Sequence, residues 1–245
     1  MPPNFWVLTF FSVLFEILYV GGLAYAYRKS DISLVYPLAR ALPLLMTALV
    51  TAVFGLGSRQ PSPVAIFGMV IVFIGCLLMP LQNFRDFRWQ VYFNPVIFLV
   101  ILAAIGTTGY TVLDSCAMQE ISRIYQKKNL LLTMSYLFFI EAGISLGALL
   151  LVCCNKTERL EFSRLVRTRS LWPILTGICS SSAYVLILLA MNFVTNVSYL
   201  QAFRQLSLPI GVLAGILILK ESHSAPKLLG TLTIVVGLVI VALFP

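Results

Sequence analysis

The chain has 245 residues, of which 60% are apolar and 11% charged, and its formal net charge is +8. A soluble domain carries about a quarter charged residues, so this composition excludes one and favours an all-α, polytopic helical membrane protein. The basic residues lie almost wholly in the breaks between apolar segments, where they set membrane orientation. We therefore expect no nucleic-acid partner.

Eight apolar segments are long enough to form membrane-spanning helices, since one crossing needs about 20 residues. The first has no basic region before it and no small-residue cleavage site after it, so it should remain as a helix. We predict one transmembrane domain over 1–245, integral to the plasma (inner) membrane. The charged break 155–170 is expected to form a short amphipathic helix. The predicted spans are about 5–27, 31–54, 62–82, 95–114, 129–153, 171–194, 197–219 and 227–244.

Two stretches of the chain, 5–82 and 171–244, repeat one pattern of three helices. The copies begin five crossings apart, and because five is odd they insert with opposite orientations. Such inverted repeats are typical of transporters, whose halves move around a site between them. We predict an incomplete first repeat over 5–82 and a complete five-helix repeat over 95–244. The matching positions are Phe5-Trp6 with Leu171-Trp172, Pro43 with Pro209, Gly68 with Gly230, and Gly75 with Gly237.

Four charged residues lie inside predicted spans, where a charge costs about 2.5–3.5 kcal/mol and usually faces a cavity or a partner. Glu16 and Glu141 lie midway along their helices, and Arg40 and Arg204 lie in the second helix of each repeat. Glu–Arg pairs would neutralise both members. The alternatives are purely structural pairs, or arginines that reach the membrane interface. Asp114, at the end of the fourth span, is predicted to be interfacial.

Neutral polar and aromatic residues add candidate contacts for a substrate. Gln201 and Gln205 flank Arg204 on one helix, and Tyr110 and Tyr136 provide aromatic rings. The alternative for each tyrosine is an interfacial belt.

Proline and glycine positions suggest where helices bend or approach closely. Pro43 and Pro209 interrupt the backbone ladder and free carbonyls inside the bundle, a structural or gating role. Gly143 and Gly147 allow close helix contact, which we expect within one chain, with a homodimer left open.

No H-E-x-x-H, G-x-S-x-G or Walker A motif occurs in the sequence. We therefore expect no enzyme activity, no catalytic residue, no cofactor, no metal site and no ATP-driven pumping. Any energy for transport would come from an ion gradient or from the gradient of the substrate itself.

The last fifty residues carry short motifs in a fixed order. They are Leu208-Pro209-Ile210-Gly211, Leu219-Lys220-Glu221, Lys227-Leu228-Leu229-Gly230, and Gly237. In this order they resemble the drug/metabolite transporter superfamily, in its ten-helix EamA-like branch. The resemblance implies structural or gating roles for Glu221, Gly230 and Gly237. It also implies two inverted five-helix repeats around a central cavity, of which this chain lacks the first two helices.

Orientation in the membrane is predicted in two opposite ways. The odd-numbered breaks hold eleven Lys and Arg residues and the even-numbered breaks four, which places both termini outside. The family resemblance implies cytoplasmic termini instead.

These observations predict a secondary active transporter, a permease or exporter of small metabolites that works by alternating access. Its partners would be the lipid bilayer and a small-molecule substrate. Glu16 and Glu141 would hold a proton or cation as coupling ion, and Arg40 and Arg204 would pair with them or anchor an anionic substrate group. The alternative is a non-transporting membrane accessory or regulatory subunit, which the missing helices favour.

Overall fold

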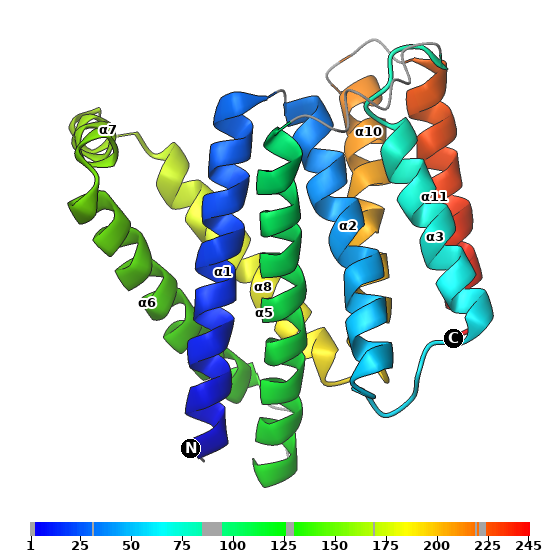
Figure 1. Cartoon of the computed structure of the whole chain (residues 1–245), viewed down its shortest axis with the longest axis horizontal. Helices are drawn as coiled ribbons and strands as arrows, with labels where there is room; N and C mark the ends of the chain where they lie inside the picture. The colour runs from blue at the N-terminus through cyan, green and yellow to red at the C-terminus, as the bar shows by residue number, and fades with distance from the viewer. Residues whose placement is uncertain are drawn as a thin grey trace. The chain divides into compact units, whose positions relative to one another are not determined.

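All regular structure in the described residues is helical, which confirms the all-α class (Figure 1). Seven of these helices are long and apolar enough to cross a membrane. The computed structural model describes residues 3–30, 32–84, 95–125, 130–168, 170–218, 220 and 224–245. The candidate spans are Asn4–Lys29, Val35–Val53, Val96–Tyr125, Leu130–Cys154, Trp172–Met191, Val197–Leu217 and Ala225–Leu243.

Two helices differ in length from the sequence prediction. The third predicted span forms α3 (Pro63–Leu78), an apolar helix of 16 residues that is shorter than each of the seven candidate spans. The fourth does not end at position 114, because α5 (Val96–Tyr125) continues for 30 residues. Residues 115–125 hold no glycine or proline and several good helix formers, so the helix persists beyond the apolar stretch. The predicted break after Asp114 is therefore wrong.

The chain divides into two compact units. Unit 1 comprises Met1–Ile17 and Leu113–Phe193, and unit 2 comprises Leu18–Val112 and Val194–Pro245. The division falls inside α1 (Pro3–Lys29) and inside α5, so each of these helices contributes to both units.

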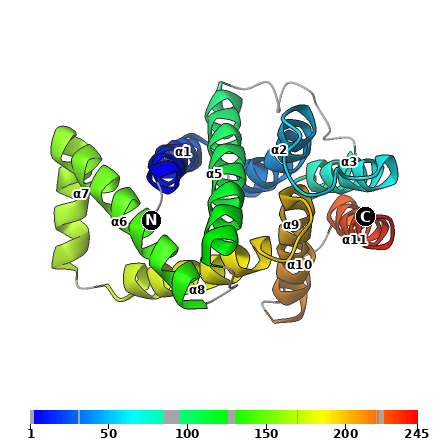
Figure 2. The ribbon, with the colours of Figure 1, turned by 90° about the horizontal axis from the view of Figure 1, so that it is seen from below.

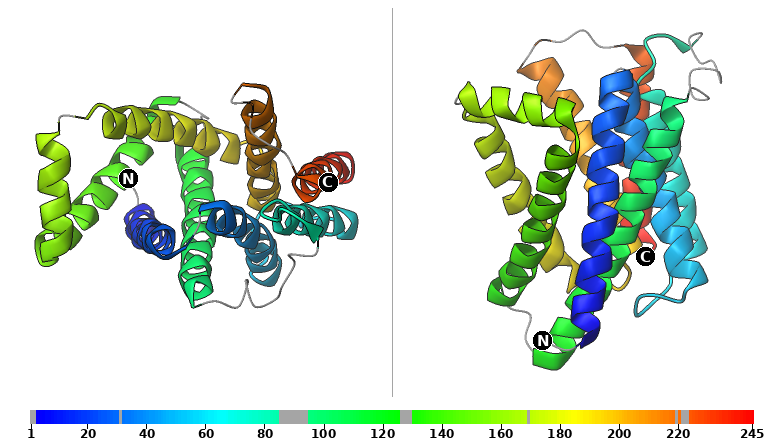
Figure 3. Two further views of the ribbon diagram at one scale, coloured as in Figure 1. Left: turned by 90° about the horizontal axis from the view of Figure 1, so that it is seen from above. Right: turned by 60° about the vertical axis from the view of Figure 1, so that its left-hand side comes forward.

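Unit 1 is completed by α6 (Leu130–Cys154), α7 (Lys156–Arg167) and α8 (Trp172–Met191). Helix α6 contacts both α7 and α8, and α7 lies across the C-terminal end of α6 (Figure 3). Helix α7 is the predicted short helix of the charged break, and it buries none of its residues.

The α1–α6 contact in unit 1 uses the glycines that the sequence marks for close packing. A Cβ atom at Gly143 would lie 2.7 Å from Val13 Cγ2, and one at Gly147 would meet Ile17. These glycines therefore pack inside one chain, as expected.

Unit 2 contains α2 (Ile32–Val53), α3, and the C-terminal helices of the chain. Helices α3 and α11 lie side by side, and α2 contacts α3 and α9 (Figures 1 and 2). The C-terminal elements are α9 (Val197–Phe203), the 3₁₀ turn η2 (Arg204–Leu206), α10 (Ser207–Leu217) and α11 (Ala225–Leu243).

The α3–α11 contact brings two backbones together at paired glycines. A Cβ at Gly75 would lie 2.7 Å from Gly230 O, and one at Gly237 would lie 2.7 Å from Gly68 O. Only a residue without a side chain permits this approach. The four glycines that the sequence repeat singles out thus form one helix–helix contact.

Serine caps tie the two ends of this contact together. Ser62 caps α3 by accepting from Ala65 N, and its hydroxyl donates to Phe244 O. Ser224 caps α11 by accepting from Lys227 N, and its hydroxyl donates to Leu81 O at 2.9 Å. Each cap therefore also satisfies a carbonyl beyond the C-terminus of the other helix.

The two prolines that the sequence singles out both lie in helices of unit 2, and only the second accompanies an interruption of regular α-helix. Pro43 lies inside α2, together with Pro37, and Pro209 lies in the first turn of α10. The ring of Pro209 crowds the carbonyl of Gln205 four residues earlier, and Pro209 has no N–H to donate to it. The 3₁₀ turn at 204–206 accommodates this break between α9 and α10.

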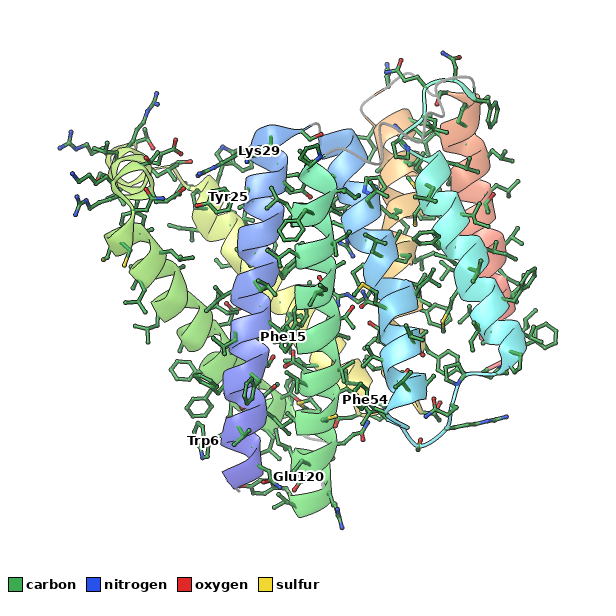
Figure 4. All side chains as sticks on the ribbon, viewed as in Figure 1. Trp6, Phe15, Tyr25, Lys29, Phe54 and Glu120 are labelled. Atoms are coloured by element: carbon green, nitrogen blue, oxygen red, sulfur yellow. The ribbon has the colours of Figure 1, made fainter. Side chains whose placement is uncertain are left out.

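Aromatic side chains mark the ends of two spanning helices. Figure 4 shows Trp6 at the N-terminal end of α1 and Phe54 at the C-terminal end of α2. Trp6 is 47% exposed and Phe54 is 72% exposed. Exposed rings at helix ends are typical of residues that meet the membrane interface.

Candidate transport sites

A buried carboxylate forms the polar centre of unit 1. Asp114 on α5 is 0% exposed. Its Oδ1 accepts from Tyr136 Oη at 2.7 Å and from Ser12 Oγ, and its Oδ2 accepts from Tyr184 Oη. Three hydroxyls from α1, α6 and α8 thus converge on one carboxyl group. Such bonds stabilise a charge that burial would otherwise penalise.

The prediction that Asp114 is interfacial is therefore wrong. It places Asp114 at the end of an apolar stretch, whereas the helix continues for three further turns beyond it. Tyr136, a predicted substrate contact, donates to Asp114, and its ring centre lies 5.6 Å from that of Phe5 in an edge-on arrangement.

The two predicted membrane glutamates both belong to unit 1. Glu141 on α6 is half-buried and accepts from Ser181 Oγ of α8 at 2.8 Å. Glu16 on α1 is also half-buried and lies one turn beyond Ser12, a donor to Asp114. Unit 1 therefore holds the carboxyl groups of Glu16, Asp114 and Glu141 on its helices α1, α5 and α6.

Arg204 in unit 2 joins two of the predicted substrate contacts. Its Nη1 donates to Gln201 Oε1 at 3.2 Å and its Nη2 to Tyr110 Oη at 3.4 Å. Tyr110 is 3% exposed, and its ring centre lies 5.7 Å from that of Tyr19. The structure thus brings together Arg204, Gln201 and Tyr110, three of the residues that the sequence predicts as contacts.

Gln205 of η2 reaches the backbone of α2 at Arg40. Gln205 is 0% exposed, and its Nε2 donates to Arg40 O at 3.0 Å and to Gln201 O at 3.2 Å. The guanidinium of Arg40 lies over the Tyr36 ring, 5.3 Å from its centre, and Nη2 donates to the hydroxyl of that ring at 3.2 Å. Arg40 is half-buried.

Unit 2 also buries polar oxygens that have no hydrogen-bond partner among the described residues. Burying such a group without a partner is unfavourable, and each one needs an explanation. Sequence reasoning missed most of them, because a threonine in an apolar helix gives little signal by itself. They are Thr47 Oγ1, Thr108 Oγ1, Thr111 Oγ1, Ser198 Oγ, Tyr199 Oη and Gln205 Oε1.

The predicted pairing of Glu16 and Glu141 with Arg40 and Arg204 stays a prediction, because the glutamates belong to unit 1 and the arginines to unit 2. Glu221, the predicted acid at the end of the penultimate helix, lies outside the described residues.

Membrane-length helices that hold buried carboxylates and amides and half-buried guanidinium groups are typical of integral membrane proteins that move polar molecules or ions. Comparison with known families matches residues 6–244 to the family described as "Sugar transport protein". The chain belongs to this family of membrane transporters, and it is an integral membrane transporter of small molecules. A search of curated proteins gave no match.

The family match confirms the broader part of the predicted resemblance, membership of a membrane transporter family. It favours transport over an accessory subunit, and transporter families are generally not enzymatic. The narrower resemblance to the EamA-like branch stays a prediction.

Proposed function

We propose that this protein is a secondary active transporter that carries sugars across the plasma (inner) membrane by alternating access. The observation that carries the proposal is the match of residues 6–244 to the sugar transport family. The buried polar side chains on its spanning helices support it, because a polar substrate crossing hydrocarbon needs such groups along its path.

The α3–α11 contact supports two inverted repeats, as in the EamA-like branch. Ser62, Gly68 and Gly75 recur 162 positions later as Ser224, Gly230 and Gly237. Gly75 approaches Gly230 and Gly68 approaches Gly237, so the first copy meets the second in reverse order. A two-fold axis in the membrane plane gives this reciprocal arrangement.

Coupling to an ion gradient is assigned to the carboxyl groups of unit 1. Glu141 is the principal candidate, because it lies midway along α6 and accepts a hydrogen bond from Ser181 Oγ of α8. Glu16 is the second candidate. A proton or a cation at these carboxyl groups would provide the driving force, with Arg40 and Arg204 as counter-charges or substrate anchors.

The proposal is tested by following sugars in cells that express the unmodified chain, Glu141→Gln, Glu120→Gln or an empty vector. Isotope-labelled D-glucose, D-xylose and D-mannitol are supplied, and their amounts in medium and cytosol are measured. We expect the unmodified chain to move at least one of them. Glu141→Gln should lose this flux while reaching the membrane in equal amount. Glu120→Gln, the same change near the C-terminal end of α5, should retain it (Figure 4).

Absence of any sugar flux, with the unmodified protein verified in the membrane, would refute sugar transport. Unchanged flux through Glu141→Gln would remove that carboxyl group from coupling and leave sugar transport intact.

A further inference from the structure

We propose that the buried polar oxygens where α2 packs against α9 and η2 in unit 2 bind the hydroxyl groups of an uncharged sugar. The inference rests on the proposed function and adds the position of the substrate site and the charge class of the substrate. The inference is argued from hydroxyl and amide oxygens and does not depend on the charged residues that the sequence predicts as sites.

The orientation of the Gln205 side chain is fixed by its neighbours. Its Nε2 donates to two backbone carbonyls, Arg40 O and Gln201 O. Reversing the amide would place Oε1 against two acceptors, so the assignment of nitrogen and oxygen is determined by the hydrogen bonds. Both amide hydrogens are then used. Oε1 is left buried without a partner among the described residues, and it can only accept.

Two contacts set the register of α2 against α9. Asn196 Nδ2 donates to Leu56 O at 3.0 Å at one end, and Gln205 Nε2 donates to Arg40 O at 3.0 Å at the other. The two segments are therefore antiparallel. Thr47 lies between these bonds on α2, and Tyr199 lies between them on α9.

The packing of the helices agrees with this register. Tyr199 belongs to the same buried cluster as Leu44 and Ala48 of α2. Thr47 lies three residues after Leu44, so these two residues share one side of the helix. Thr47 is 0% exposed and Tyr199 is 6% exposed, and neither hydroxyl has a partner among the described residues.

Neighbouring threonines show that a missing partner is not a general property of these helices. Thr51, one turn beyond Thr47 on α2, donates to Ala48 O at 3.1 Å. Thr107 on α5 donates to Ala103 O at 2.9 Å, whereas Thr108 and Thr111 have unpartnered hydroxyls among the described residues. The buried hydroxyls thus fall into a set satisfied by the helix itself and a set that is not.

The chemistry of the second set selects the ligand. Threonine and tyrosine hydroxyls both donate and accept, and Gln205 Oε1 only accepts. A sugar hydroxyl donates and accepts as well, so it can satisfy every member of the set. A carboxylate or phosphate offers acceptors alone and would leave Gln205 Oε1 unsatisfied. Arg204, the neighbour of Gln205 in sequence, donates to Tyr110 of α5, and these two side chains add further donors.

The test uses the purified full chain in proteoliposomes, with Thr47→Val and Tyr199→Phe as variants. Thr51→Val is the matched control, because it removes a buried hydroxyl from the same helix that the helix itself satisfies. Uptake of labelled D-glucose, D-xylose, D-mannitol and D-glucuronate gives KM and maximal rate for each protein. Thermal unfolding in detergent, with and without each compound, gives stability and binding.

We expect Thr47→Val and Tyr199→Phe each to raise KM for the transported neutral sugar about tenfold, since each loses one buried hydrogen bond to it. The ligand-free melting temperature should stay the same or rise, because each change deletes an unsatisfied polar group. The stabilisation by sugar should shrink in both variants and persist in Thr51→Val. D-Glucuronate, which differs from D-glucose by a carboxylate, should neither be taken up nor compete.

Neutral-sugar uptake by the unmodified chain with unchanged KM in both variants would overturn the site and leave the proposed function standing. Lower melting temperatures in both variants without a change in KM would show that the hydroxyls are structural, which also overturns the site. Efficient D-glucuronate uptake would overturn the assignment of an uncharged substrate. No uptake of any of the four compounds would overturn sugar transport, and the inference with it.

Discussion

The two units of this transporter use different polar chemistry. Every Asp and Glu side chain in the described stretches belongs to unit 1. Unit 2 instead buries amides and hydroxyls, and Arg40 and Arg204 lie away from the ends of its spanning helices. In unit 1 both oxygens of Asp114 accept hydrogen bonds, whereas in unit 2 several buried oxygens have no partner among the described residues.

This difference separates stability from binding. A polar group that neighbouring helices satisfy stabilises the fold, and its removal leaves partners unpaired. A buried polar group without a partner costs stability and gains a partner when a ligand or an ordered water binds to it. We therefore expect substitutions in the polar centre of unit 1 to unfold the protein, and substitutions in the polar set of unit 2 to change substrate affinity.

The largest effect is expected for Asp114→Ala. It leaves Ser12, Tyr136 and Tyr184 without their common acceptor, and hydrogen bonds to a charged group are worth about 1.5–3 kcal/mol each. If the three contributions add, the free energy of unfolding should fall by roughly 4.5–9 kcal/mol. Thermal unfolding of the detergent-purified protein and its yield as a monodisperse species measure the loss.

Glu120→Ala is the matched control for this substitution, because it removes a carboxylate six residues further along α5. Equal melting temperatures for Asp114→Ala and Glu120→Ala would contradict a structural role for the polar centre of unit 1. The units would then not differ in the way proposed, because the polar centre of unit 1 would not stabilise the fold.

A smaller effect is expected where the units differ in how closely their helices pack. In unit 2 a Cβ at Gly75 would lie 2.7 Å from Gly230 O and 2.9 Å from Ile234 N, both backbone atoms. Gly75→Ala should therefore separate α3 from α11 and cost about 1–3 kcal/mol of unfolding free energy. In unit 1 a Cβ at Gly147 would meet the flexible end of the Ile17 side chain, which can rotate away.

Thermal unfolding of Gly75→Ala, Gly147→Ala and Gly211→Ala checks this ordering. A Cβ at Gly211 would meet no atom within 4 Å, so Gly211→Ala should be neutral or stabilise by up to about 1 kcal/mol. A loss at Gly147 as large as that at Gly75 would show that both units pack backbone against backbone.

The sequence predicts the fold far better than it predicts the polar interior. Apolar segments of membrane length locate the spanning helices, because hydrocarbon demands them. Their ends are less certain: the stretch after Asp114 is polar enough to resemble a loop, yet it is helical. Charged residues such as Glu141 and Arg204 stand out in an apolar helix. Thr47 does not, because partnership with a helix carbonyl depends on side-chain geometry rather than on residue type.

The repeat carried more information than the glycines and prolines alone revealed. Ser62 and Ser224 are separated by the same 162 positions as Gly68 and Gly230. This spacing could have predicted that both serines cap their helices. The reciprocal bonds to Leu81 O and Phe244 O depend on how α3 and α11 pair, which the spacing does not show.

The smallest effect compares helix caps in the two units. Ser224→Ala removes the acceptor for Lys227 N and the donor to Leu81 O, at a helix that packs along its whole length against α3. It should cost about 1 kcal/mol of unfolding free energy.

Asn155 caps α7 by accepting from Thr157 N at 3.0 Å, but α7 buries none of its residues. Asn155→Ala should therefore loosen α7 alone, because a helix without buried contacts opens independently of global unfolding. The melting temperature should fall only in Ser224→Ala. The rate of hydrogen exchange at 156–167 should rise only in Asn155→Ala. A shared fall in melting temperature would mean that α7 is part of the cooperative fold of unit 1.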